Sequence, residues 1–107
     1  RKEFETELFI PGSKEGLNIE LDKAFRLDDF ITMGQLIAYD ALNREESCGG
    51  HFREEYQTEE GEAKRDDENF FYVACWEYQG SDDKAPVLYK EPLVYEAIKV
   101  QTRNYKS

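Results

Sequence analysis

One short stretch of this sequence gathers residue types that can do chemistry. Cys48 and His51 lie three positions apart around Gly49-Gly50, and His51 is the only histidine in the chain. A cysteine beside a histidine can form a thiolate–imidazole dyad for nucleophilic catalysis. No apolar wall flanks the pair, so a cleft would have to come from elsewhere in the fold. A small thiol enzyme is therefore one hypothesis, and thiol titration would reveal its reactive cysteine.

Metal binding and phosphate binding are the other chemistries that this stretch suggests. Cys48, His51 and Cys75 offer three ligands, but structural zinc takes four, usually from two closely spaced pairs. The acidic residues between 54 and 69 lack the spacing of a calcium-binding loop. Two adjacent glycines are too few for a phosphate-binding turn. We therefore expect no catalytic residue, no cofactor-binding residue and no metal site in this chain.

The composition predicts a folded domain with a heavily charged exterior. Aromatic residues make up 14% of the 107 residues, and their rings bury large areas, which argues against disorder. The net charge of −10 disfavours binding to phosphate backbones and to anionic membrane surfaces. No apolar run reaches the roughly 18–20 residues that span a bilayer. We expect no nucleic-acid partner and no direct membrane insertion, and the two cysteines favour a reducing compartment.

The first half of the chain has the apolar spacing of helices. Residues 1–10 carry apolar side chains four apart and end at Pro11-Gly12, which predicts a short helix before a turn. From Asn18, a candidate N-cap, to Arg44, apolar residues recur every three or four positions. This pattern predicts a helix that buries a wide face. One long helix or two short ones joined near Leu27 both fit it.

The second half changes to the composition of a loop and two strands. Residues 46–69 carry many charges and few apolar side chains, which predicts a solvated acidic loop. Aromatic and β-branched residues predict strands at 70–79 and 87–100, separated by a turn at 80–86. Pro92 places the second strand at a sheet edge or a bend. We expect the rings of the first strand to form core.

These elements predict the α+β class, with an antiparallel helical bundle-like N-terminal part followed by a C-terminal β-hairpin. We expect residues 1–107 to form a single domain. The chain opens without an initiator methionine on what resembles the last turns of a helix, so we also expect a piece of a longer protein. The expected parts are a helical part at 1–45, an acidic loop at 46–69, a strand hairpin at 70–100 and a frayed tail at 101–107.

Two ordered motifs resemble the flavoprotein subunits of succinate dehydrogenase and fumarate reductase. The segment ALNREESCGGHFREE follows the family motif that ends a long helix, and RDDENF follows the motif that precedes a strand hairpin. The spacer YQTEEGEAK and the tail resemble the Bacteroides-type version. Cys48 stands where most of the family has arginine, and Gly50 stands where alanine is common. The lost arginine removes a planar set of hydrogen-bond donors.

The resemblance implies a subunit that carries FAD and interconverts succinate and fumarate. The family's dinucleotide fingerprint, flavin-linking histidine and substrate-binding residues lie upstream of this region, so no residue here is assigned to them. The part present resembles the C-terminal helical domain and final strand segment, which implies a structural role. The implied partners are its own flavin-binding domain and the iron–sulfur subunit. The implied location is the cytoplasm, peripheral to the inner membrane through the complex.

The resemblance also implies that the matched residues fix turns and dock against the rest of the subunit. They are Arg44, Glu46, Ser47, Gly49, Gly50, His51, Arg53, Arg65, Asp66 and Asp67. A docking surface left bare predicts some self-association of the isolated chain. The alternative interpretation is a stand-alone acidic protein-interaction module on the same scaffold.

Overall fold

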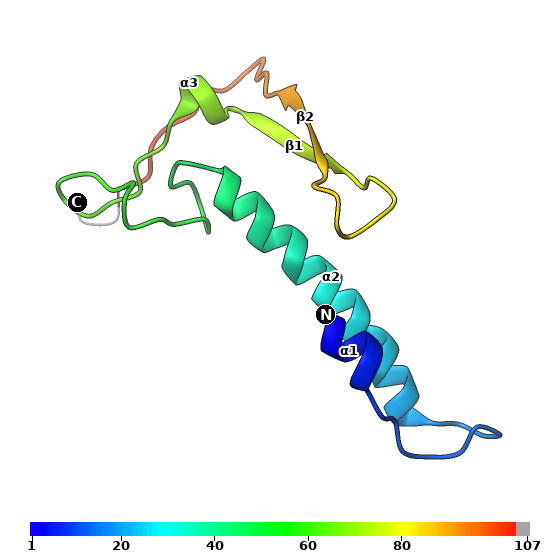
Figure 1. Cartoon of the computed structure of the whole chain (residues 1–107). Coiled ribbons are helices and arrows are strands. Elements are labelled where there is room, and N and C mark those ends of the chain that lie inside the picture. The colour runs from blue at the N-terminus through cyan, green and yellow to red at the C-terminus, as the bar shows by residue number, and fades with distance from the viewer. Residues whose placement is uncertain (105–107) are drawn as a thin grey trace. The chain divides into compact units, whose positions relative to one another are not determined.

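The computed structural model describes residues 1–104, which divide into two compact units, one of residues 1–43 and one that begins at Arg44. Helices come first and an antiparallel hairpin follows, which confirms the α+β class. The elements labelled in Figure 1 are α1 (Lys2–Glu7), α2 (Ile19–Asn43), α3 (Asp67–Phe70), β1 (Tyr72–Glu77) and β2 (Val87–Pro92).

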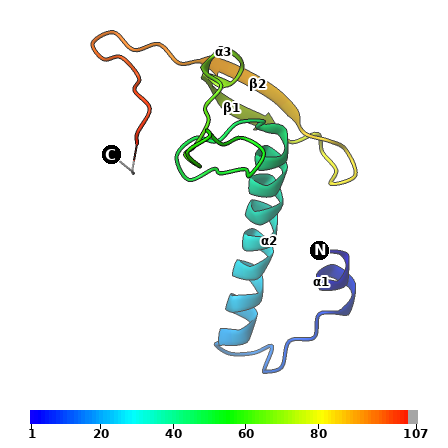
Figure 2. The same ribbon diagram turned by 90° about the vertical axis from the view of Figure 1, so that its left-hand side faces the viewer.

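The first unit consists of a short helix and a long one that run in opposite directions (Figures 1 and 2). Asn18 caps α2 as predicted, because its Oδ1 accepts a hydrogen bond of 3.1 Å from the Leu21 amide. α2 is one continuous helix rather than two short ones. Arg1 Nη1 of the first helix region donates to Thr32 Oγ1 of α2 over 3.3 Å. No helix among residues 1–104 is long and apolar enough to cross a membrane.

The prediction that α2 buries a wide face is wrong for the chain by itself. No residue of Ile19–Asn43 is buried, and Phe25, Phe30 and Ile37 expose 66%, 68% and 64% of their surface. Two physical reasons account for this. The apolar side chains spread around the whole circumference of α2 instead of forming one stripe, and α1, with six residues, is too short to cover them.

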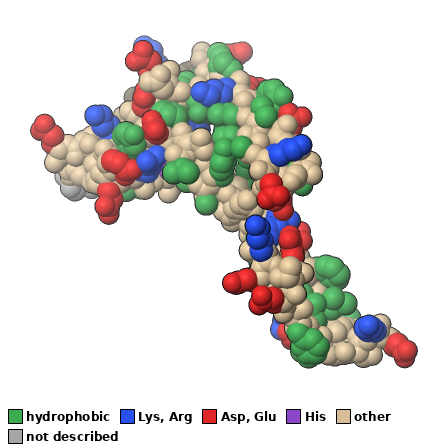
Figure 3. All heavy atoms as spheres, viewed as in Figure 1, with side chains coloured by type: hydrophobic (Ala, Val, Ile, Leu, Met, Phe, Trp, Pro, Cys, Tyr) green, Lys and Arg blue, Asp and Glu red, His purple; other side chains and the backbone are tan. Residues whose placement is uncertain are grey.

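The predicted aromatic core does not form either. No hydrophobic side chain of residues 1–104 is buried. The rings of Phe70, Phe71, Tyr72 and Trp76 are half-buried, and Tyr78 is exposed. A two-stranded sheet has one layer and cannot enclose side chains without a second layer packed on it. Figure 3 shows hydrophobic side chains at the surface of both units.

The hairpin confirms the two predicted strands but shortens both. β1 starts at Tyr72 because the preceding residues form the helical turn α3. β2 ends at Pro92, which has no amide proton to donate to a ladder. The register pairs Tyr72 with Pro92 and Glu77 with Val87. The turn between the strands contains Gly80 at φ +83°, as the turn prediction for 80–86 requires.

The acidic segment 46–69 is more ordered than a solvated loop. It contains two isolated antiparallel bridges, Cys48 with His51 and Gln57 with Ala63. It also contains Glu46 and Ser47, the only two buried residues of the described chain. Within the predicted tail, residues 101–104 have no regular secondary structure, and residues 105–107 lie outside the described part.

Candidate structural and docking site

The paired glycines form the turn of a very small hairpin. The Cys48 amide donates to the His51 carbonyl over 2.8 Å, and the His51 amide donates back over 3.0 Å. Gly49 has φ +58°, in the left-handed region, whereas Gly50 does not have a positive φ. A positive φ at the first central position only is the pattern of a type II′ turn, which suits a two-residue hairpin. The glycines therefore have a conformational role.

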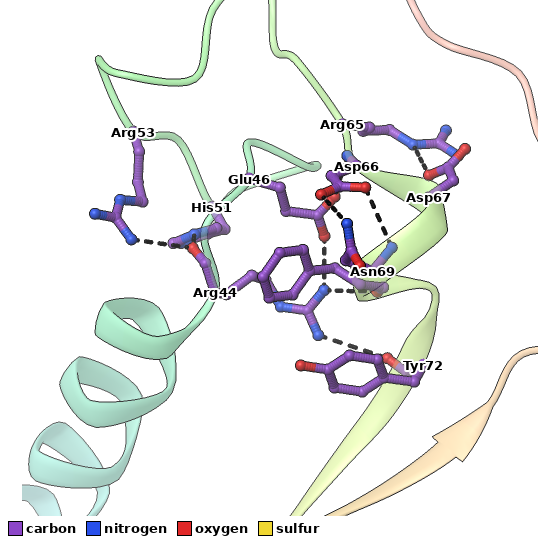
Figure 4. Close-up of polar contacts among 10 residues, drawn as sticks. Arg44, Glu46, His51, Arg53, Arg65, Asp66, Asp67, Asn69 and Tyr72 are labelled. Carbon is purple, nitrogen blue, oxygen red and sulfur yellow. Dashed lines mark hydrogen bonds and ion pairs between the residues drawn. The ribbon is translucent and has the colours of Figure 1, made fainter.

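His51 and Arg53 reach the same backbone oxygen. His51 Nε2 lies 2.9 Å from the Arg44 carbonyl oxygen, and Arg53 Nη1 donates to that oxygen over 3.3 Å (Figure 4). A carbonyl oxygen only accepts hydrogen bonds, so the proton of the imidazole belongs on Nε2. That nitrogen therefore serves a backbone carbonyl that follows the end of α2, and not the thiol of Cys48.

Ser47 closes the other side of this turn from a fully buried position. Its hydroxyl donates to the Arg53 carbonyl over 3.1 Å and accepts from the Arg53 amide over 2.8 Å. Its own amide donates to the Lys64 carbonyl over 2.9 Å. One short side chain thus bonds both backbone groups of Arg53, whose carbonyl also accepts from the Tyr56 amide over 2.9 Å.

Glu46 links the two sequence motifs through its carboxylate, which is 3% exposed. Oε1 accepts from Arg44 Nη1 over 2.7 Å, and Oε2 accepts from the Asp66 amide over 2.8 Å (Figure 4). We call Arg44, Glu46 and Asp66 the motif junction. A buried carboxylate needs a counter-charge and hydrogen-bond donors, and this one has both.

Arg44 extends the motif junction to the start of the hairpin. Nη1 donates to the Phe70 carbonyl over 3.1 Å, and Nη2 lies 3.5 Å from the Tyr72 carbonyl. The guanidinium also stacks on both rings, with its carbon 5.2 Å from the Tyr72 centroid and 5.8 Å from the Phe70 centroid. A planar group with five donors suits this set of partners better than lysine would.

The second motif is a capped turn with internal ion pairing. Asp66 caps α3, since its carboxylate accepts from the Asn69 amide over 3.2 Å and from Asn69 Nδ2 over 2.9 Å. These hydrogen bonds, that of the Asn69 side chain first, lower the pKa of Asp66 below its ordinary value. Arg65 forms a two-point ion pair with Asp67, with Nε 2.9 Å from Oδ1, and also donates to the Gln101 carbonyl over 3.1 Å.

The ten residues expected to fix turns and to dock all lie in the second unit, and all take part in the contacts or the turn described above. A Cβ at either glycine of that turn would meet nothing within 4 Å. The sequence did not single out the Phe70 and Tyr72 carbonyls as partners of Arg44. The resemblance named Glu46 and not Glu45, but nothing in the sequence indicated that Glu46 would be buried.

The described residues also bear on the chemistry that the sequence suggested. Residues 1–104 contain no group of three His, Cys, Asp or Glu side chains positioned to hold a metal ion. Cys48 and Cys75 are free, exposed thiols. The polar side chains of the two motifs are instead directed at one another and at backbone groups. These contacts hold the turns of the two motifs in place.

Comparison with known proteins identifies the family to which the two motifs belong. No curated protein and no solved structure matches the chain. A family model described as "Fumarate reductase flavoprotein C-term" matches residues 1–105, which include both units of the fold and both motifs. The match covers nearly the whole chain and confirms the resemblance seen in the motifs. The chain therefore belongs to the family of C-terminal domains of succinate dehydrogenase and fumarate reductase flavoproteins.

Proposed function

We propose that this chain is a structural domain of a flavoprotein subunit that interconverts succinate and fumarate, and that it docks against the flavin-binding part of that subunit. Membership of this family supports a parent subunit that either oxidises succinate or reduces fumarate. The proposal further assigns the iron–sulfur subunit as a neighbour in the complex. It places the assembled complex at the cytoplasmic side of the inner membrane, with this domain peripheral to the bilayer.

The observation that carries the docking role is the apolar surface of α2. Apolar side chains occur on every side of α2 among seven charged ones, yet none of residues 19–43 is buried. Many large apolar side chains exposed on one helix favour a surface that another protein surface covers. Phe25, Phe30 and Ile37 leave about two-thirds of their surface in water, so covering each would add about 1–2 kcal/mol of transfer free energy. A second protein surface on α2 recovers that free energy.

The FAD of the proposed parent subunit does not fit the residues of this chain. A dinucleotide site of the Rossmann type needs a strand, a glycine-rich turn and a helix in that order. In the described residues both strands follow the helices along the chain, so no such unit exists here. We therefore assign the FAD to the part of the parent subunit that this sequence does not include, and derive no step of the reaction from this domain.

The two motifs contribute to docking by fixing the path of the chain in the second unit. The motif junction and the bonds of His51 and Arg53 to the Arg44 carbonyl set the path of the chain from residue 44 to the hairpin. Every partner in these contacts belongs to the second unit. The motifs thus shape one docking surface and leave the reacting groups to other parts of the subunit.

Alanine variants in the full-length subunit test this proposal. We expect His51→Ala and Arg53→Ala to lower the yield of assembled complex and its flavin content, because each removes a donor to the Arg44 carbonyl. Turnover per bound flavin should stay near that of the unmodified enzyme. Glu59→Ala is the matched control, since Glu59 is exposed and lies in the same acidic segment. Normal assembly and flavin content with lost turnover would refute the structural role.

A further inference from the structure

One face of the hairpin is not covered by the rest of the second unit. Alternation along β1 and β2 and their register place six residues on this face. We call it the outer face, and it consists of Val73, Cys75, Glu77, Val87, Tyr89 and Glu91. All six are exposed, whereas on the opposite face Tyr72, Ala74, Trp76 and Leu88 are half-buried.

The outer face has an apolar centre between two carboxylates. Cys75 pairs with Tyr89 in the middle of the ladder, Val73 pairs with Glu91 towards one end, and Glu77 pairs with Val87 at the other. Val73, Val87 and Tyr89 expose 50%, 42% and 56% of their surface. The acidic groups therefore stand at opposite corners of an apolar strip.

The Tyr89 side chain is held in place on this strip. Its hydroxyl donates to Glu77 Oε2 over 2.8 Å, across the two strands. That hydrogen bond leaves Glu77 Oε1 and further lone pairs of the carboxylate for a second donor. An ordered tyrosine beside a carboxylate is a favourable place for an incoming ammonium or guanidinium group, which the ring also attracts.

The charges on the hairpin indicate which class of molecule can bind the outer face. None of the six outer-face side chains is cationic. The lysine of β2, Lys90, belongs to the opposite face, where its Nζ lies 4.7 Å from the centroid of the Tyr72 ring. With a net charge of −10 for the chain, nucleic acid and anionic lipid are repelled. A second copy of the same face would bring four carboxylates together, which is unfavourable as well.

We infer that the outer face binds a cationic segment of a partner protein, one that presents apolar side chains between lysine or arginine residues. The apolar strip receives the apolar side chains, and Glu77 and Glu91 receive the flanking cations. This inference goes beyond the proposed docking of α2, because it concerns a different unit and a surface of different chemistry. An extended segment suits the strip, because alternate side chains of a strand point to the same side.

A designed peptide tests the inference on the 107-residue chain. The probe is a dye-labelled peptide of seven residues with lysine at both ends, valine at the third and fifth positions and serine between them, so that in an extended form lysines and valines share one side. Its binding is followed by fluorescence anisotropy. We expect saturable binding that weakens as salt is raised, because the pairs at the corners are partly exposed. The double variant Glu77→Gln/Glu91→Gln should raise the Kd by roughly twofold to thirtyfold, the range expected for two exposed ion pairs. Glutamine at 77 keeps an acceptor for Tyr89.

Matched controls separate this site from general attraction to an acidic protein. Glu3→Gln/Glu15→Gln changes the net charge equally, at exposed positions in the other unit, and should leave the Kd unchanged. The same peptide with serine in place of both valines should bind more weakly, since it lacks the apolar side chains. Far-UV circular dichroism of each variant verifies that the fold is retained.

Three results would overturn the inference. The first is equal loss of affinity in both double variants, which would show attraction to net charge alone. The second is equal binding of the probe with glutamate in place of both terminal lysines, which would show that Glu77 and Glu91 do not select a cationic partner. The third is concentration-dependent self-association in sedimentation velocity that Val73→Asn or Tyr89→Ser abolishes, which would assign the outer face to a second copy of the chain. None of these results depends on the assembly of the parent subunit.

Discussion

At the residue scale, one carboxylate holds together two motifs that lie twenty positions apart. The Asp66 amide and the Arg44 guanidinium both donate to Glu46, which is almost completely enclosed. Its neighbour Glu45 is exposed. Removal of one partner of a buried pair leaves the other without compensation, which costs more than the pair itself contributes. The contacts of Glu46 are therefore the most sensitive point of the second unit.

We predict that Glu46→Ala opens the contact between the two motifs. The Asp66 amide loses its acceptor, so its hydrogen exchange should accelerate by at least about tenfold, as expected for loss of a buried hydrogen bond. Glu46→Gln keeps an acceptor but loses the charge, so its effect should be smaller. Amide exchange followed by nuclear magnetic resonance measures both, and Glu45→Ala is the control. Unchanged protection of Asp66 in Glu46→Ala would contradict the geometry.

Asp66 gives the cap of α3 a dependence on pH. The Asn69 side chain and amide lower the pKa of Asp66, so the unfolded form takes up a proton at a higher pH than the folded one. The stability that the cap contributes is complete above the ordinary carboxyl pKa, about 3.9, and is lost as pH falls through the lower pKa of the folded form. We predict that the amide chemical shift of Asn69 titrates below about pH 4. In Asp66→Asn the shift should stay constant, and a persistent titration there would assign it to another group.

At the element scale, the two glycines of the tight hairpin at Gly49-Gly50 differ in backbone conformation, although both have room for a side chain. A Cβ at either glycine would meet nothing within 4 Å, so neither position is restricted by space. Only Gly49 has a positive φ, at +58°. An L-residue with a side chain pays about 1–2 kcal/mol in that region of backbone conformation. The two glycines therefore form a matched pair for experiment.

We predict different outcomes for alanine at the two positions. Gly49→Ala should accelerate exchange of the His51 amide, which donates to the Cys48 carbonyl, by about fivefold to thirtyfold. Gly50→Ala should leave that exchange rate close to the original. Equal effects at both positions would mean that the turn differs from the one described here.

At the scale of the whole molecule, the chain combines a high negative charge with an apolar surface that it does not cover. Residues 1–104 bury no hydrophobic side chain, although the sequence is 39% hydrophobic. The two proposals divide that surface, with α2 assigned to the parent subunit and the outer face of the hairpin assigned to a cationic partner. Their tests use different units and different readouts. The flavin content of the His51 variants and the peptide affinity of the Glu77 and Glu91 variants can therefore succeed or fail separately.

The sequence by itself determined the class of fold, the family and the positions of the turns. Apolar spacing of three and four sets α2, and Asn18 caps it because its side chain can accept from the first turn. The two motifs predicted the family that the match over residues 1–105 then showed. These features depend on local chemistry or on order along the chain, and a sequence records both directly.

Burial and pairing were decided only by the tertiary structure. Periodicity indicated which residues of α2 are apolar, but it could not show that this chain lacks a partner layer to cover them. Adjacent Glu45 and Glu46 look alike in sequence, and only the approach of Arg44 and the Asp66 amide makes one of them a buried link. Burial depends on what a chain packs against, and that information lies in long-range contacts rather than in local pattern.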